Sequence, residues 1–355
     1  MSKKGRVLVA MSGGIDSSVA AILLMEQGYE VVGITMKTWD YDNSGSSGKE
    51  TGCCSLDSIN DARNIAVDLG FHHTILDIRN EFGDYVIDYF TDEYMNGRTP
   101  NPCVLCNTHI KWDALLKRAD KLGCQFIATG HYAKIKSKND RYYISMGRDM
   151  NKDQSYALWG ISQKNLSRTI FPLGDLEKSE IKKIAIDRGY DNLVKKSESY
   201  EICFVPDNNY RDFLKHRVDN INDKVKKGDF IDENGKIVGK HEGYPFYTIG
   251  QRKGLGLALG YPVYVTEINK TKNEVTVGTF NELQRDGMYV DKLNFMKFDS
   301  INGRMDSITK IRYNDIGSRA VLEQIDNSIK VFFGNGVNAI TPGQAAVFYD
   351  GKDVI

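Results

Sequence analysis

The strongest constraint on the fold is the alternation of short apolar runs with helix-like segments in the first part of the chain. The continuous apolar run Arg6–Ala10 precedes a loop of small residues, and the segment from there to Gly28 has helical spacing of its apolar residues. The same order follows for Glu30–Met36 and the helical pattern Ser58–Gly70. This alternation predicts an α/β domain with a doubly wound parallel sheet covered by helices.

Two further segments continue the pattern. Phe71–Ile78 is typical of a strand, His109–Gly123 of a helix ending at a glycine, and Gln125–His131 of a strand that leads into a loop. In a doubly wound sheet ligands bind outside the carboxyl ends of the strands. We therefore expect the functional residues of this half in the loops that follow strands.

The second half of the chain has a different character. From Gly228 onward short strand-like segments are separated by Gly, Asn and Asp turns, which indicates an all-β half built from two small units, the last of them barrel-like. We predict three domains, at residues 1–207, 208–282 and 283–355. The segment 41–52, rich in Ser and Gly, is expected to be a mobile loop.

Composition narrows the classes of function. Lys+Arg and Asp+Glu both number 47 among 355 residues, so any site for a polyanion has to be a local patch. The N-terminus resembles neither a signal peptide nor a membrane span, and a cytoplasmic location is expected. Six cysteines in such a chain indicate thiols that are buried, catalytic or metal-bound.

The loop Ser12–Ser18, SGGIDSS, lies between the first strand and the first helix. Small residues there allow backbone N–H groups to converge on an anion, and the positive end of the helix adds to the attraction. The loop has neither the Lys of a Walker-type phosphate loop nor the spacing of a dinucleotide fold. The alternative is an ordinary capped turn. The loop Ser12–Ser18 also resembles that of the PP-loop ATP pyrophosphatase superfamily, whose members split ATP between the α and β phosphates.

This resemblance implies a set of ATP-binding residues. The glycine amides and the hydroxyls of Ser12, Ser17 and Ser18 would hold pyrophosphate, Asp16 would hold Mg²⁺, and Met36 and Gly130 would line the adenine and ribose. Taken alone, a methionine or a glycine is more often packing or a turn. The full expected set is Ala10, Met11, Ser12, Gly13, Gly14, Ile15, Asp16, Ser17, Met36 and Gly130.

Three of the cysteines are candidates for chemistry. Cys106 lies just before a helix that Asn107 or Thr108 can cap, and a helix N-terminus favours a thiolate. Cys103 forms a C-x-x-C pair with it, and Cys203 lies far along the chain. Structural zinc prefers four ligands in two close pairs, so zinc is disfavoured. No catalytic role is expected for the others, which are Cys53, Cys54 and Cys124.

Together these motifs resemble the tRNA-specific 2-thiouridylases, over essentially the whole chain. The matching segments, in the family's order, are MSGGIDSSVAA, GRTPNPCVLCN, IKWDAL, ATGHYAKI, KDQSYAL, EICFVP, YTIGQRKGLG, KIRY and TPGQAAVFY. The resemblance implies that ATP adenylates the 2-oxygen of the wobble uridine and that a persulfide sulfur on Cys203 replaces the AMP. Cys106 would then be the nucleophile that leaves a Cys106–Cys203 disulfide for a reductant to reopen.

Cys103 departs from the commoner family pattern, in which Asp stands at this position. A thiol is a weaker acid and does not inherit the acid–base role of a carboxylate. An alternative route to the same product is a [4Fe–4S] cluster held by Cys103, Cys106 and Cys203. Two other readings are a different adenylating ligase of the superfamily and a non-catalytic nucleotide or tRNA binder, although neither explains Cys106 and Cys203.

The resemblance also implies contacts with a wobble base that is turned out of the anticodon loop into a protein pocket. The basic segments 133–141, 224–228 and 250–254 are candidates for phosphate contacts, although such charges are often only a solvated face. The expected partners are tRNA, a persulfide donor protein and a cellular reductant, and a monomer is expected. The implied tRNA contacts are Asn101, Pro102, Cys103, His131, Lys152, Asp153, Gln154, Arg312, Tyr313 and Gln344.

Overall fold

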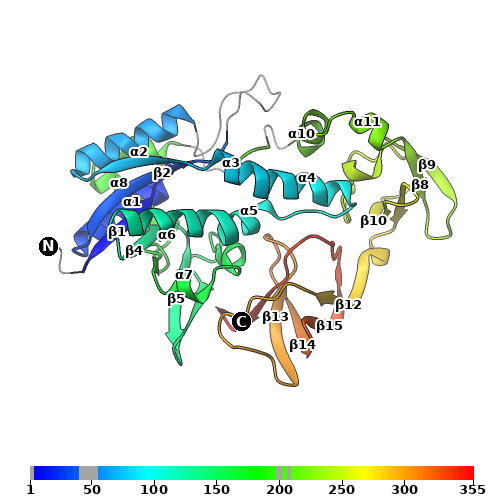
Figure 1. The fold of residues 1–355 in the computed structure, drawn as a ribbon. Coiled ribbons are helices and arrows are strands. Elements are labelled where there is room, and N and C mark those ends of the chain that lie inside the picture. Colours follow the sequence, from blue (N-terminus) through cyan, green and yellow to red (C-terminus); the bar gives the residue numbers. More distant parts are fainter. Residues whose placement is uncertain (1–3, 40–54, 197–201, 206–208) are drawn as a thin grey trace.

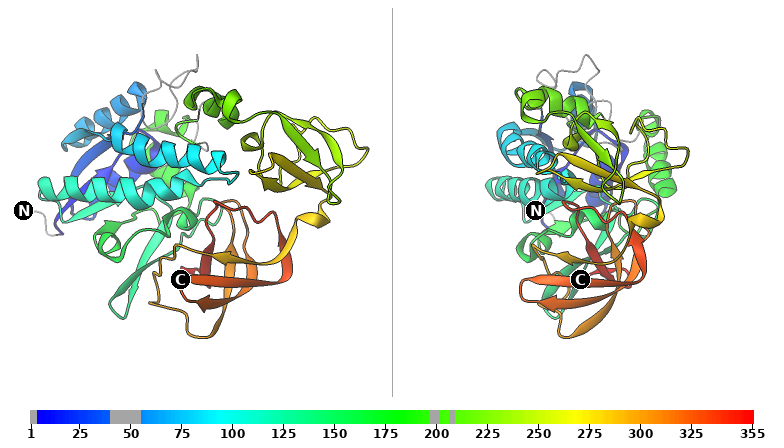
Figure 2. Two further views of the ribbon diagram at one scale, coloured as in Figure 1. Left: turned by 45° about the vertical axis from the view of Figure 1, so that its right-hand side comes forward. Right: turned by 90° about the vertical axis from the view of Figure 1, so that its right-hand side faces the viewer.

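The structure is a computed structural model that describes residues 4–39, 55–196, 202–205 and 209–355. The predicted loop 41–52 and the pair Cys53 and Cys54 lie outside the described residues. Figure 1 and Figure 2 show an α/β region followed by two β units, one beside it and one below it in the view of Figure 1. The predicted fold class is confirmed.

The N-terminal region is built on a five-stranded sheet whose pairs are all parallel. Its central strand β1 (Arg6–Ala10) is the continuous apolar run expected of a strand covered on both faces. The order across the sheet is β3 (His73–Asp77), β2 (Glu30–Lys37), β1, β4 (Phe126–Thr129) and β7 (Thr169–Ile170).

Helices cover both faces of this sheet. Val7 and Val9 share a core cluster with α1 (Ile15–Glu26), whereas Leu8 points the other way and shares one with α6 (Trp112–Lys121). This division follows from the alternation of side chains along a strand. The first face also carries α2 (Leu56–Leu69), α8 (Lys178–Asp187) and α9 (Asp191–Val194).

The strand order reverses at β1, and this reversal places the loops after β1 and β4 together. The chain leaves β1 toward β2 and β3 and then returns to the other side of β1 as β4. Ala10 pairs with Thr129 at the carboxyl ends of the two strands. Such a switch point is where open α/β sheets bind ligands.

A continuous helical stretch carries the Cys103–Cys106 pair. It runs through α5 (Pro102–Leu105), the π-helical turn η3 (Cys106–Lys111) and α6. The predicted cap at Asn107 or Thr108 is wrong, because the helix begins earlier, with the Asn101 side chain accepting from the Val104 N–H and proline in the first turn. A second helical stretch comprises α3 (Arg79–Phe82), η2 (Gly83–Ile87) and α4 (Asp88–Met95).

The first β unit is a four-stranded sheet in the order β10 (Tyr264–Asn269), β11 (Glu274–Gly278), β8 (Gly228–Ile231) and β9 (Ile237–His241). Helices α10 (Tyr210–Arg217) and α11 (Ile221–Lys224) precede it. Phe230 of β8 is fully buried in a cluster that also contains Phe90 and Tyr94 of α4. The unit therefore shares a core with the end of the α/β region.

The last sheet has eight strands, and two of them come from the N-terminal half. The hairpin of β5 (Ala133–Lys138) and β6 (Arg141–Met146) joins the C-terminal strands because β6 pairs with β17 (Asp353–Val354). This pairing is not apparent from the sequence. The other strands are β12 (Gln284–Val290), β13 (Arg304–Lys310), β14 (Ser318–Ile325), β15 (Ser328–Asn338) and β16 (Val347–Asp350).

Four short helices complete the description. They are η4 (Ser155–Leu158), α7 (Gln163–Leu166), η6 (Tyr244–Phe246) and η7 (Asn281–Leu283).

Candidate active site

The loop after β1 is held in one shape by two glycines. Gly13 has a φ of +69°, and a Cβ atom there would lie 2.1 Å from the carbonyl oxygen of Ser58. Gly14 is the N-cap of α1, and none of the described side chains caps this helix end. The first amides of α1 are therefore left for a ligand, and with the helix dipole they favour an anion.

The serine hydroxyls of the loop have different roles in this structure. Ser17 and Ser18 are buried and donate to the carbonyl oxygen of Gly14, at 3.2 and 2.8 Å. The N–H of Ser12 donates to Ser17 Oγ at 3.1 Å. Ser12 itself is exposed, so its hydroxyl is the most accessible of the three. The buried pair shapes the loop, and the exposed serine faces what enters it.

Asp16 in the first turn of α1 is the charged centre of this loop. Its carboxylate accepts from Lys178 Nζ at 2.8 and 2.9 Å and from the Tyr132 hydroxyl at 2.5 Å. Gly130 lies against it, since a Cβ on Gly130 would approach the Asp16 carbonyl carbon to 2.8 Å. A carboxylate at this place suits Mg²⁺, and Lys178 adds a positive charge beside it.

The remaining predicted ATP-binding residues are mostly apolar. Met11 and Ile15 are buried in the core beneath the loop, and Ala10 is partly buried. Met36, at the carboxyl end of β2, is partly buried and packs against two core clusters. Met36 therefore has a packing role in this structure. Its predicted role in lining the adenine and ribose stays a prediction.

The segment that starts at Asn101 places Cys103 and Cys106 in contrasting surroundings. Cys103 follows Pro102 in the first helical turn and is exposed. Crowding by protein atoms nevertheless raises the pKa of its thiol, and Lys111 only partly opposes this. Cys106 is 5% exposed and belongs to the core cluster that also contains Phe204 and Val205.

Cys203 immediately precedes those two core residues and is exposed. Because Phe204 and Val205 share a cluster with Cys106, the second cysteine segment packs on the same core as the first. Across the described parts of the chain, no three His, Cys, Asp or Glu side chains gather closely enough to hold a metal ion. The three thiols therefore do not form a ready cradle for an iron–sulfur cluster.

His131 lies between the phosphate loop and the helix of Cys106. It follows Gly130, exchanges a hydrogen bond with Thr129 Oγ1 at 2.7 Å, and packs against Trp112 at a ring-centroid distance of 5.8 Å. Burial, with a smaller effect of Lys111, lowers the pKa of His131 to about 3. Its imidazole is therefore neutral at physiological pH.

The segment Lys152–Gln154 supports the neighbouring loop. Gln154 accepts from the Tyr132 N–H through its side chain and donates to the Tyr132 carbonyl through its backbone, both at 3.0 Å. Asp153 accepts from the Gly147 N–H at 3.0 Å and from the Ser155 hydroxyl at 2.7 Å. Asp153 and Gln154, both predicted tRNA contacts, thus have internal partners in the described structure.

The predicted contacts of the β half come close to the Asn101 segment. Tyr313, which is exposed, reaches the carbonyl oxygen of Asp153 at 3.5 Å, and the adjacent Arg312 is exposed as well. Gln344 donates to the carbonyl oxygens of Thr99 and Pro100 at 3.0 and 2.9 Å. Tyr313 and Gln344 of the β half therefore lie next to Asp153 and the Thr99–Pro100 segment, although they are far from them in the sequence.

The predicted basic segments are only partly available to a polyanion. In 133–141, Lys134 forms an ion pair with Asp175, and Lys136 pairs with Asp353 at 2.8 Å. By contrast, Arg252 and Lys253 are exposed beside a hollow of about 270 Å³.

Comparisons with known proteins place the whole chain in one family. Three family models match consecutive segments: a tRNA methyl transferase HUP domain at residues 5–207, a tRNA methyl transferase PRC-barrel domain at 211–279, and an aminomethyltransferase β-barrel domain at 285–355. The tRNA-specific 2-thiouridylase of Amoebophilus asiaticus is 71% identical over 354 residues, which cover 99% of this chain and 94% of that protein. The chain belongs to the tRNA-specific 2-thiouridylases.

Two other 2-thiouridylases agree with this assignment. The protein of Cytophaga hutchinsonii is 67% identical and that of Salinibacter ruber 57% identical, each over all of this chain, with 97% and 94% of the relatives covered. The family models carry methyl transferase descriptions, whereas these relatives are named thiouridylases. The chain is assigned to the thiouridylases because these relatives match it over its full length. No helix in the described residues is long and apolar enough to cross a membrane.

Three residues that border the site of this 2-thiouridylase are not among those predicted from the sequence. Lys178 and Tyr132 bond Asp16, and Tyr156 lies between Asn101 and Tyr313, with its ring 6.1 Å from that of Tyr313. The sequence signal for Lys178 is the capping box of Glu177 and Glu180, which marks the start of α8 and places Lys178 in its first turn. The sequence pattern contains no signal that Lys178 pairs with Asp16.

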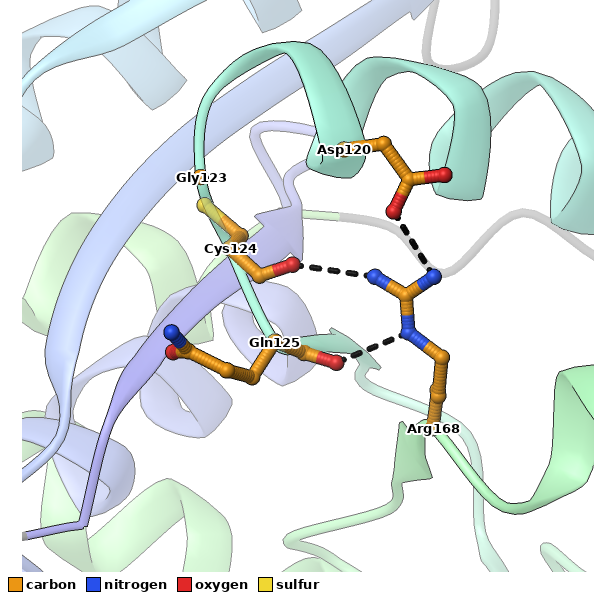
Figure 3. A pocket seen from close by; sticks show the side chains of 5 residues that line it. All are labelled: Asp120, Gly123, Cys124, Gln125 and Arg168. Carbon is orange, nitrogen blue, oxygen red and sulfur yellow. Dashed lines mark hydrogen bonds and ion pairs between the residues drawn. The ribbon is translucent and has the colours of Figure 1, made fainter.

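A hollow of about 450 Å³ in the 2-thiouridylase lies away from this site (Figure 3). It borders Gln125 at the amino end of β4, the opposite end of the sheet from the phosphate loop. Arg168 lines this hollow. It forms an ion pair with Asp120 at 2.7 Å and donates hydrogen bonds to the carbonyl oxygens of Cys124 and Gln125 at 3.0 and 2.9 Å. We regard this group as structural.

Proposed function

We propose that this protein catalyses the ATP-dependent 2-thiolation of the wobble uridine of tRNA. The observation that carries the proposal is the position of the segment Gly130–Tyr132. On one side it contacts Asp16 of the phosphate loop, and on the other His131 packs on Trp112 in the helix that bears Cys106. A nucleotide in the loop and a thiol from the helix thus serve one substrate.

The first step in this proposal activates the base. The uridine 2-oxygen attacks the α-phosphorus of ATP, and the bond to the β-phosphate breaks to release pyrophosphate. The amides at the start of α1 and Ser12 hold the departing phosphates, and Lys178 supplies positive charge beside them. Asp16 would hold Mg²⁺, which neutralises phosphate charge when it is bound.

The second step replaces the AMP by sulfur. Cys203, which is exposed, accepts a persulfide from a donor protein. The thiolate of Cys106 attacks Cys203 Sγ, the terminal sulfur leaves as hydrosulfide and attacks C2 of the activated uridine, and AMP departs. The product disulfide joins Cys106 and Cys203 and is reopened by a cellular reductant.

Cys106 needs a local movement for this step, because its side chain is 5% exposed in the core. The segment 202–205 that carries Cys203 packs on the same cluster, so a shift of this segment uncovers the thiol it is to meet. The residues present do not fit a resident iron–sulfur cluster, since no group of three potential ligands is gathered in the described residues. We derive no step through one.

The tRNA contacts follow from the same arrangement. The base enters beside Asn101, Pro102 and Cys103, with His131 as a neutral neighbour. Lys152, Arg312, Tyr313 and the exposed Arg252 and Lys253 lie on surfaces that a tRNA backbone can reach, whereas net charge contributes nothing because acidic and basic residues balance. The protein acts as a monomer in the cytoplasm.

The test is a reconstitution with ATP, Mg²⁺, tRNA transcript and a chemical persulfide source. We expect pyrophosphate, AMP and 2-thiouridine in equal amounts, limited to one turnover when no reductant is added. The outcome with tRNA present separates the alternatives: a ligase for another substrate and a non-catalytic binder would both form no pyrophosphate from this mixture. Omission of tRNA is the control and should stop pyrophosphate release by the thiouridylase.

Serine variants locate the sulfur chemistry. Cys106→Ser and Cys203→Ser should each abolish 2-thiouridine while pyrophosphate release persists, because the phosphate loop contains neither residue. Cys124→Ser is the matched control, since this thiol is buried at the far end of β4. Thiouridine formation by Cys203→Ser would refute the proposed sulfur path.

A further inference from the structure

The turn Thr341–Ala345 of the C-terminal sheet is bonded directly to the segment that leads into the base-binding residues. The N–H of Thr99 donates to the Pro342 carbonyl oxygen at 2.9 Å. Gln344 Nε2 donates to the carbonyl oxygens of Thr99 and Pro100 at 3.0 and 2.9 Å. Three hydrogen bonds therefore join the two segments.

The turn is also tightly enclosed. Gly343 has a φ of +94°, and a Cβ atom there would lie 2.7 Å from the carbonyl oxygen of Thr99 and 2.9 Å from Glu93 Oε2. The Tyr156 hydroxyl donates to the Ala345 carbonyl oxygen at 2.7 Å. The turn is thus held between α4, the Thr99 segment and η4, all of which belong to the N-terminal region.

The part of the segment that the turn touches lies beyond the hydrogen bonds that join Asn96, Gly97 and Arg98 to α4. Residues 96–101 connect α4 to α5, and the Asn101 side chain at their end caps the helix that carries Cys103 and Cys106. Pro100 and Pro102 have no N–H to donate. The carbonyl oxygens of Thr99 and Pro100 are therefore paired by the side chain of Gln344, whose loss would leave two partly buried acceptors without that donor.

We propose that the turn 341–345 is a positioning element of the active site, and that Gln344 sets the rate of thiolation by holding the Asn101–Cys103 segment in place. This rests on the proposed function. It differs from a contact with tRNA, because the hydrogen bonds of Gln344 are already made in the protein without RNA. The C-terminal sheet thereby contributes to the catalytic step as well as to binding.

The first test uses Gln344→Met, which keeps the length of the side chain and removes its donors without adding charge. We expect kcat for thiolation at saturating tRNA to fall about tenfold, the size of two lost hydrogen bonds, with the KM for tRNA changed less than about threefold. A residue that only contacts tRNA would give the opposite split, a raised KM with unchanged kcat, and that result would overturn the proposal.

A pair of glycine variants tests the turn itself. Gly343→Ala introduces both an unfavourable φ and a clash with Thr99, whereas Gly351→Ala introduces only the unfavourable φ, of +63°, with open space around it. We expect kcat to fall about tenfold or more for Gly343→Ala and less than about twofold for Gly351→Ala. Equal effects would show that backbone strain, and not the contact with Thr99, is responsible.

A measurement without RNA separates this inference from the proposed function. Hydrogen exchange of the backbone amides of residues 99–104 should be about tenfold faster in Gln344→Met than in the unmodified protein, while amides of β1 are unchanged. Unchanged exchange at Thr99 would overturn the positioning role even if the protein makes 2-thiouridine. Faster exchange in a protein that makes none would leave the positioning role standing and the proposed function refuted.

Discussion

The phosphate loop and the thiol region are built in opposite ways. Residues 11–18 form one continuous loop whose shape is set by short-range bonds among Gly14, Ser12, Ser17 and Ser18. The thiol region draws on two separate segments, and one of its thiols, Cys106, is nearly enclosed in a core cluster. The loop is therefore preformed, whereas the proposed sulfur path requires a movement that uncovers Cys106.

This difference matches the chemistry of each site. Holding triphosphate requires several fixed donors, and fixed donors cost little reorganisation when charge develops. In the proposed sulfur path a persulfide is received from another protein, which suits the exposed Cys203, and is then shielded, which suits the buried Cys106. A rigid site for adenylation and a movable one for sulfur follow from these two demands.

The largest effect is expected from Gly13→Ala, which tests whether the phosphate loop has to keep its shape to bind ATP. The new Cβ would lie 2.1 Å from the Ser58 carbonyl oxygen, so the loop has to move. ATP affinity should fall at least about 100-fold, measured by calorimetric titration. Gly70→Ala is the matched control: its φ of +75° is equally unfavourable, but nothing lies within 4 Å. ATP affinity should be unchanged there, and an equal loss in both variants would contradict the interpretation.

Lys178→Met should have the next largest effect, because it removes the cation beside Asp16. We expect pyrophosphate release to slow about 30-fold, measured as a single turnover at saturating ATP. The matched control is Arg188→Met, which breaks an exposed pair with Glu26 at the other end of the same two helices. Exposed pairs contribute little, so its rate should change less than about twofold. A normal rate for Lys178→Met would limit this residue to a structural role.

The movable half of the comparison can be tested by alkylation in the absence of tRNA. Cys203 is exposed and Cys106 is 5% exposed, so iodoacetamide should modify Cys203 at least about tenfold faster. Mass spectrometry of the peptides gives both rates, with the buried Cys124 as an internal reference. If Cys106 reacts as fast as Cys203, the thiol region is open without tRNA and no movement is needed.

The sequence predicted the phosphate loop and the α/β layout because both depend on neighbouring residues. The run Arg6–Ala10 and the small residues after it define a strand and an anion-binding turn on their own. The helix start at Asn101 was also visible in Asn-Pro, but the cap was predicted at Asn107 or Thr108. The side chain of Asn107 is in fact buried and donates to the Ala157 carbonyl oxygen at 2.9 Å.

What the sequence did not reveal depends on distant partners. The segment 133–141 is a candidate for phosphate contacts by its sequence, with a solvated face as the alternative. Lys134 and Lys136 in fact lie on a hairpin that joins the C-terminal sheet, and they pair with Asp175 and Asp353. In the same way, the burial of Lys178 is set by Asp16, which lies in another helix. Local periodicity contains no information about which strand or carboxylate will be the neighbour.

The smallest effect concerns His131, which stands between the two regions. Its pKa in the folded protein is about 3, below the ordinary 6.5, so below pH 6.5 the unfolded chain takes up a proton that the folded protein does not. Folding stability should therefore decrease as the pH falls. Between pH 7 and pH 6 this amounts to about 0.7 kcal/mol of unfolding free energy, which His131→Asn should remove. Urea unfolding at both pH values measures it, with the exposed His216→Asn as the control. If the wild-type protein and His131→Asn lose equal stability, His131 takes up a proton as readily in the folded protein as in the unfolded chain, and a neighbour that stays neutral beside the base would have to be sought elsewhere.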